Sequence, residues 1–207
     1  MWYKVNKIRL GTNQIRPATY SYSYDFRNKT TTQVTNDGWS TFNDVRSWSV
    51  DSNWVHIVWY PWNLKKTIGN SYFQNAKKIT IESHFNIQTY ATNIYITATS
   101  GSSSVISNSW SNIDTRQSFR KIIFNWGPVN QTNASIPYWE YDSKVVFDLV
   151  NKTATLSLSW YADTTASLTD ADITDVKNNV TDLLIWFYND SNSNTASYVR
   201  NILLTIE

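Results

Sequence analysis

The chain has 207 residues, no cysteine, 11 tryptophans and a net charge of +2 from 18 basic and 16 acidic residues. This length fits one all-β domain with a short extension, and a chain of this size folds without a disulfide or metal staple. A charge this small excludes a nucleic-acid-binding face, because such a face needs many clustered cations. The composition therefore predicts a globular β protein with no nucleic-acid partner.

The N-terminal segment, residues 1–17, differs from the rest of the chain in charge. It carries four cations and no acid, which leaves 14 basic against 16 acidic residues, a net charge of −2, in the remainder. The pattern predicts a β-hairpin that turns at residues 11–13 and ends at Pro17. A hairpin this short is not stable alone, so we expect it to dock on its own sandwich or on a neighbouring subunit.

The same N-terminal residues predict no secretory signal, because Lys4, Lys7 and Arg9 interrupt any apolar stretch. No window of the sequence is apolar enough to span a membrane. We therefore expect synthesis in the cytosol and no membrane partner. The absence of cysteine is consistent with folding in a reducing compartment.

The remainder of the chain alternates apolar and polar residues with period two, which predicts roughly a dozen strands. These strands and hairpins are expected at 19–26, 46–60, 77–88, 93–99, 119–126, 144–160, 180–188 and 198–207. The segment 144–160 should turn tightly at Asn151 and Lys152, because Asn tolerates a positive φ. The segment 180–188 is almost continuously apolar, as expected for a strand that is buried on both faces.

One helix is expected after Thr169, whose side chain can cap it and whose following aspartates suit a helix N-terminus. The Ser/Thr/Asn-rich segments 99–118, 127–136 and 189–197 are expected to be long loops. Many short strands with long loops favour an all-β, two-sheet jelly-roll β-sandwich over residues 18–207, rather than a shorter immunoglobulin-type sandwich. The C-terminal strand should lie beside 19–26, since either strand alone would expose an edge.

Two groups of residues are candidates for glycan binding. Trp62 and Trp139 stand beside prolines and outside the clean alternation, so their rings are the best placed to be exposed and to stack on a sugar. Glu82, His84 and Asn86 share the outward face of one predicted strand and could hold a polar ligand. The competing interpretations are that the tryptophans fill the core and that the three polar residues form an ordinary solvated face.

The sequence predicts no enzyme, no cofactor and no metal. Jelly-roll glucanases carry three acids on one strand, and the nearest match is Glu140-Tyr141-Asp142-Ser143-Lys144-Val145, which has valine in the third acid position. Glycoside hydrolysis needs a correctly placed pair of carboxylates, so a hydrolase or lyase is disfavoured. Asp170, Asp172 and Asp175 imitate the start of a calcium loop but lack its glycine and its final glutamate.

The N-terminal segment also carries a resemblance, in the residues KVNKIRLGTNQIRP. It resembles the opening of many structural proteins of tailed bacteriophages, which begin with a short strand, a Leu-Gly turn and a similar close. The body, from YDFRN to YVRNILLTIE, looks like the concanavalin A-like or laminin G-like jelly roll that is often attached to such arms. This resemblance implies a virion protein, and it carries over no binding residue.

The leading hypothesis is therefore a non-enzymatic bacteriophage virion protein, with residues 1–17 as an attachment arm and residues 18–207 displayed as a decoration, head-fibre or tail-associated domain. We expect Lys7, Arg9 and Arg16 to meet acidic groups of capsid or tail proteins, while Leu10 and Ile15 pack into a partner or the body. A homo-oligomer on the particle is expected. The alternative is a carbohydrate-binding module that recognises host or environmental glycans.

Overall fold

The structure is a computed structural model of the chain. It describes residues 19–42, 48–50, 55–57, 62–86, 92–99, 106–110, 120–124, 127–132, 140–160, 162–187 and 198–207. The predicted arm, residues 1–17, lies outside the described residues. No helix among the described residues has the length and apolarity that crossing a membrane requires.

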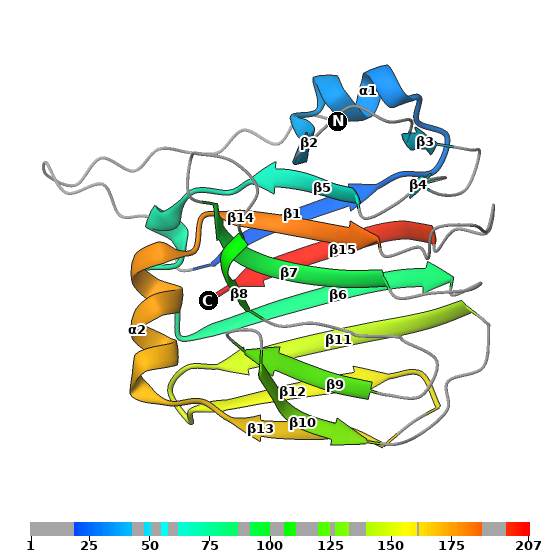
Figure 1. Ribbon diagram of the computed structural model, residues 1–207. Helices are drawn as coiled ribbons and strands as arrows, with labels where there is room; N and C mark the ends of the chain where they lie inside the picture. Colours follow the sequence, from blue (N-terminus) through cyan, green and yellow to red (C-terminus); the bar gives the residue numbers. More distant parts are fainter. Residues whose placement is uncertain are drawn as a thin grey trace, which may run out of the picture.

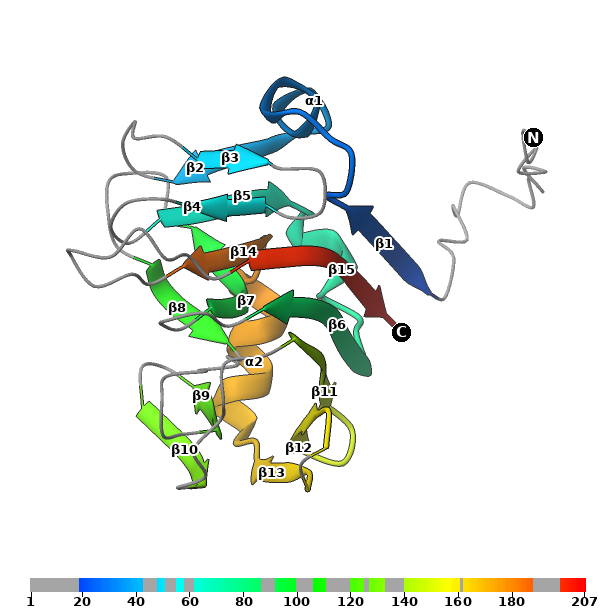
Figure 2. The ribbon, with the colours of Figure 1, turned by 90° about the vertical axis from the view of Figure 1, so that its right-hand side faces the viewer.

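Two antiparallel sheets stack face to face, as Figures 1 and 2 show. Sheet A contains β1 (Tyr20–Asp25), β3 (Trp48–Val50), β4 (Val55–Ile57), β6 (Lys78–Asn86), β11 (Glu140–Asp148), β12 (Thr153–Leu158), β13 (Thr164–Ser167) and β15 (Tyr198–Ile206). Sheet B contains β2 (Trp39–Phe42), β5 (Trp62–Thr67), β7 (Thr92–Thr99), β8 (Ile106–Trp110), β9 (Arg120–Phe124), β10 (Gly127–Thr132) and β14 (Asp182–Phe187). This arrangement confirms the predicted two-sheet jelly-roll sandwich.

The C-terminal strand β15 lies inside sheet A, beside β6 on one edge and beside β1 and β4 on the other. Its pairing with β1 is antiparallel, from Tyr20 opposite Ile206 to Asp25 opposite Asn201. The first and last described strands are thus neighbours, as the alternation predicted. Figure 1 shows this as the blue β1 next to the red β15.

The core forms one contiguous cluster with side chains from both sheets. Its largest fully buried members are Trp39, Tyr141, Phe26, Phe73, Phe147, Leu64, Ile79 and Ile81. Period-two alternation places these residues on the inner faces, because successive side chains of a strand point to opposite sides. In β14 three consecutive residues, Leu183, Leu184 and Ile185, are 0 % exposed, which confirms a strand buried on both faces.

The helix predicted after Thr169 is α2 (Asp170–Asn179), and it begins with a reciprocal capping box. The Asp172 backbone N–H donates to the Thr169 hydroxyl at 3.1 Å, while the Thr169 backbone N–H donates to the Asp172 carboxylate at 2.7 Å. This cap accounts for Asp172 without calcium. The helix runs along one side of the sandwich in Figure 1.

A second helix, α1 (Thr31–Asn36), was not predicted, and a single helical turn, η1 (Asn70–Tyr72), also lies outside the prediction. The signal for α1 was the pair Thr30 and Gln33, which forms the same kind of capping box. One buried residue, Val34, was too little periodicity to distinguish this short helix from a turn.

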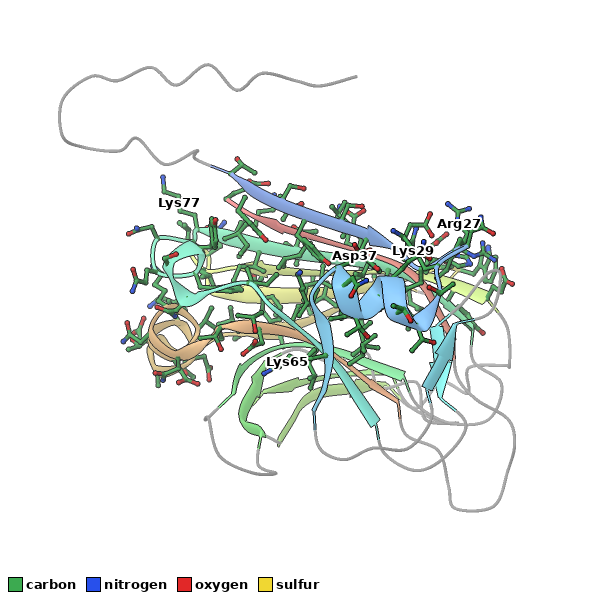
Figure 3. The ribbon with its side chains drawn as sticks, turned by 90° about the horizontal axis from the view of Figure 1, so that it is seen from above. Arg27, Lys29, Asp37, Lys65 and Lys77 are labelled. Atoms are coloured by element: carbon green, nitrogen blue, oxygen red, sulfur yellow. The ribbon has the colours of Figure 1, made fainter. Side chains whose placement is uncertain are left out.

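The corner that holds α1 is fixed by Asp37. Its carboxylate accepts hydrogen bonds from the Tyr24 hydroxyl at 2.8 Å and the Lys29 ammonium at 3.1 Å, and its backbone carbonyl accepts from Lys66 at 2.6 Å. The Tyr24 hydrogen bond, together with Lys29, lowers the pKa of Asp37. Figure 3 shows Lys29 and Asp37 beside each other at α1.

Three details of the predicted connections were wrong. Segments 99–118 and 127–136 were expected to be loops, but each contains a strand, β8 and β10 respectively. Both strands are rich in Ser, Asn, Gln or Thr, so their sheet structure rests on pairing with neighbours rather than on an apolar pattern. The segment 189–197 lies outside the described residues.

The third difference is the turn between β11 and β12. Asp148 lies opposite Thr153, so the connection has four residues and is not the tight two-residue turn that was predicted. The positive φ falls on Lys152 (55°) rather than Asn151. The Asp148 carboxylate organises the loop by accepting from the backbone N–H groups of Asn151 at 2.8 Å and Val150 at 3.1 Å.

These hydrogen bonds lower the pKa of Asp148 below its ordinary value of 3.8, and the bond from the Asn151 backbone N–H makes the largest contribution. A lowered folded-state pKa adds stability above the unfolded pKa, and this stability is lost as the pH falls through the folded pKa. We therefore expect Asp148→Asn to reduce the free energy of unfolding at neutral pH, with the difference from wild type shrinking below about pH 4. Urea unfolding at several pH values measures this. A difference that stays constant with pH would contradict it.

Candidate functional site

The outer face of sheet A carries the polar side chains that the core excludes. On β6 the buried Ile79 and Ile81 face inward, while Glu82 and His84 face outward. On β11 the buried Tyr141 and Val145 face inward. Glu140, Asp142 and Lys144 alternate with them and face outward.

The strand register aligns these outward residues into two rows that cross five strands. The lysine row runs from β1 to β12 through Ser23, Leu203, Glu82, Lys144 and Ser157, each directly opposite the next. The histidine row lies two residues further along each strand and runs through Asp25, Asn201, His84, Asp142 and Ser159. The rows are therefore about 7 Å apart on one face.

His84 sits between two carboxylates of the neighbouring strand. Its Nδ1 lies 2.6 Å from Asp142 Oδ1 and its Nε2 lies 3.2 Å from Glu140 Oε2. A protonated imidazole can donate to both acids, whereas a neutral one donates from a single ring nitrogen. An Arg200 guanidinium nitrogen lies 3.6 Å from the same Glu140 oxygen.

The backbone also fixes the position of His84. Its N–H donates to the side-chain oxygen of Asn201 at 3.0 Å, at the point where the β15 register shifts by one residue. The extra residue is Arg200, and bulges of this kind redirect side chains on a sheet. The His84 side chain is 18 % exposed, whereas that of Asp142 is 80 % exposed, so the carboxylate is the part of the pair that a ligand reaches first.

In the lysine row, the Lys144 ammonium lies 3.0 Å from Glu82 Oε1. Both side chains are about half exposed, at 50 % and 43 %. An exposed ion pair of this kind contributes roughly 0–1 kcal/mol to stability. The pair therefore adds little to the stability of the fold.

A groove of about 610 Å³ is lined by all five residues of the lysine row and by Asn201, Asp142 and Ser159 of the histidine row. Its lining includes Ser23, Glu82, Asp142, Lys144, Ser157 and Ser159. The rows thus present hydroxyls, carboxylates and an ammonium in one recess, which are groups that donate to and accept from hydroxylated ligands.

An exposed tryptophan follows the groove residue Ser159. Trp160 is 77 % exposed, adopts a left-handed backbone conformation (φ 64°) and has its ring centroid 5.9 Å from that of Tyr141. Its exposed ring offers the type of surface on which sugar rings stack. Trp160 was not among the predicted site residues. It ends the alternating segment 144–160, and a tryptophan outside the regular alternation, such as Trp62, is a candidate for an exposed ring.

The predicted site residues fall into two groups. Glu82 and His84 lie in the two rows, and Asn86 is in the same strand opposite Glu140, although its side chain is not among those described. Trp62 begins β5, in the other sheet, and its side chain is likewise not described. Trp139 and the arm residues Lys7, Arg9, Leu10, Ile15 and Arg16 lie outside the described residues.

The structure also explains the incomplete glucanase pattern. Val145 is 1 % exposed and belongs to the core, so the third outward position after Glu140 and Asp142 is Lys144. Among the described residues, no group of three or more His, Asp or Glu side chains is arranged to hold a metal ion.

No protein-family model matches the sequence, and a search of curated proteins gives no match. Solved structures are similar in fold. A winged bean acidic lectin complexed with methyl-α-D-galactose has a TM-score of 0.65 and 12% identity, over 91% of this chain and 98% of the lectin. The CBM2 module of the evolved Dit protein of Lactobacillus casei BL23 phage J-1 has a TM-score of 0.59 and 14% identity, over 92% and 98%.

A third similar structure is that of the carbohydrate esterase vb_24B_21 from the Shiga toxin-encoding bacteriophage φ24B. Its TM-score is 0.56 and its identity 13%, over 89% of this chain and 97% of that one. Identities this low establish the fold alone. The chain has the jelly-roll sandwich of the legume lectins, and its structural neighbours include phage proteins.

Proposed function

We propose that this chain is a non-enzymatic structural protein of a bacteriophage particle, and that its displayed sandwich binds glycans through the outer face of sheet A. The observation that carries the glycan-binding part is the groove lined by the two rows, in which the exposed carboxylate of Asp142 is fixed by its contact with His84. Sugar hydroxyls are both donors and acceptors, so they match a surface that offers carboxylates, hydroxyls and an ammonium side by side.

One further observation supports the proposal. The fold is shared with a lectin that was solved with a galactoside and with a phage-borne CBM2 module. The particle assignment rests on the phage neighbours and on the arm resemblance, and its partners would be capsid or tail proteins.

The test of glycan binding is a glycan array of bacterial surface polysaccharides probed with the full chain and with Asp142→Ala. Hydrogen bonds to a charged group contribute about 1.5–3 kcal/mol, so we expect a loss of affinity of roughly tenfold to a hundredfold. Asp163→Ala, which removes another exposed aspartate outside the rows, is the matched control and should bind as wild type. Equal binding by both variants would place the site elsewhere.

We expect no hydrolysis of glycosidic bonds. A retaining enzyme needs one carboxylate as nucleophile and another as acid, whereas Glu140 and Asp142 both contact His84 and the third outward position of β11 is Lys144, paired with Glu82. Incubation with a polysaccharide panel should release no reducing sugar above the level of a heat-denatured sample. Release that Glu140→Gln or Glu82→Gln abolishes would identify an enzyme and overturn this part of the proposal.

A further inference from the structure

The length of the two rows indicates how much ligand the groove accommodates. The rows cross five strands, from Ser23 on β1 to Ser157 on β12. Four spacings between neighbouring strands extend over about 19 Å. A single sugar would contact only one part of such a row, whereas a chain of several linked sugars lying across the strands would contact all of it.

The charges of the rows indicate the class of chain. Lys144 is paired with Glu82 at 3.0 Å, Arg200 lies 3.6 Å from Glu140, and His84 contacts two carboxylates. An anionic ligand would therefore have to displace a carboxylate of the protein from Lys144 and from Arg200. It would also approach Asp142, whose carboxylate is 80 % exposed, and like charges at close range disfavour binding.

At the β1 end, the only charge in the rows is Asp25, and it is paired with Arg27 at 2.5 Å. The other row residues that line the groove are uncharged: Ser23, Ser157, Ser159, Asn201 and Leu203. The serine hydroxyls lie at the two ends of the rows, with the charged pairs between them. Apart from Leu203, the two rows are thus polar, with no cation left unpaired among these described contacts.

We infer that the outer face of sheet A binds an uncharged, linear stretch of polysaccharide that lies across the strands along the two rows. This inference rests on the proposed function and specifies its ligand class. Neutral sugars satisfy hydroxyls and carboxylates without breaking an ion pair, while acidic polysaccharides are rejected by Asp142 and Glu82.

The experiment is calorimetric titration of the full chain with neutral gluco- and galacto-oligosaccharides of one to six units and with oligogalacturonates of the same lengths. For one neutral series we expect affinity to rise about tenfold or more between one and four units and then to level off, because the groove is filled. Oligogalacturonates of equal length should bind at least about tenfold more weakly.

Two variants on one strand locate the ligand. Ser157→Trp fills the β12 end of the groove and should remove the gain in affinity with chain length. Thr153→Trp places the same ring on the same face of β12, four residues or about 13 Å away, and should bind as wild type. Asp142→Asn combined with Glu82→Gln should raise the affinity for oligogalacturonates relative to the neutral series.

The outcomes separate the two levels of the proposal. Affinity that is equal for one and four units, or a preference for oligogalacturonates, overturns the inference but leaves glycan binding intact. No binding to any member of either series or of the polysaccharide array overturns the proposed function as well. If Ser157→Trp leaves binding unchanged, the ligand binds at another site and the inference is overturned. If Ser157→Trp changes the mass measured by sedimentation, a second copy of the chain occupies this face, and the inference is overturned as well.

Discussion

Replacement of Leu204 by aspartate is expected to prevent the chain from folding. Leu204 is 0 % exposed in the inner face of β15, opposite Tyr22 of β1 and Ile81 of β6. An unpaired carboxylate at this position loses its hydration, which costs several kcal/mol, against a total stability of about 5–15 kcal/mol for a domain. The variant should accumulate in the insoluble fraction or lack a cooperative urea transition.

The matched control is Thr205→Asp, which introduces the same charge one residue further along the same strand. Thr205 faces outward and is partly exposed. We expect its free energy of unfolding to change by no more than about 1 kcal/mol, as is usual for surface positions. A Leu204→Asp protein that unfolds cooperatively with near wild-type stability would mean that β15 is not a central strand of the sandwich.

Deletion of residues 1–17 is expected to abolish incorporation into phage particles while leaving the sandwich folded. The core of the described part of the chain is contributed by residues between Tyr24 and Ile206, and we expect it to form without the arm. The proposed attachment uses the cations Lys7, Arg9 and Arg16 against acidic groups of a particle protein. Immunoblots of purified particles, with thermal unfolding of the truncated protein, measure both effects.

Charge reversal provides the control for this deletion. Arg9→Glu with Arg16→Glu should reduce incorporation strongly, because attraction to an acidic surface becomes repulsion. Arg27→Glu reverses a cation of the body, which is paired with Asp25, and should leave incorporation unchanged. Wild-type occupancy by the truncated chain would exclude the arm as the anchor.

The strand pattern was predictable wherever one face of a strand is apolar. The alternation in β1, β6 and β15 and the apolar run of β14 each gave the correct element, because burial selects residue types at a fixed period. The cap of α2 was predictable because it is local: Thr169 and Asp172, three residues apart in the chain, form hydrogen bonds with each other. β8 and β10 could not be predicted, because their polar residues become strands only by pairing with neighbouring strands.

The candidate site was predictable only in part. Two-residue spacing placed Glu82 and His84 on one face of one strand, which is a property of the chain alone. Their partners, Asp142 and Lys144, lie about 60 residues away and belong to the site only because β6 and β11 pair in one register. A register shifted by one residue would have opposed His84 to a core position instead.

The sequence alone therefore determined the class of fold, the central strands, the cap of α2 and a polar outer face on β6. These are local consequences of residue type and period. Only the tertiary structure decided which strands are neighbours, and with that the alignment of five outward residues into each row, the position of His84 between two acids and the exposure of Trp160. Those features depend on strand register and on packing between distant segments, which no local pattern encodes.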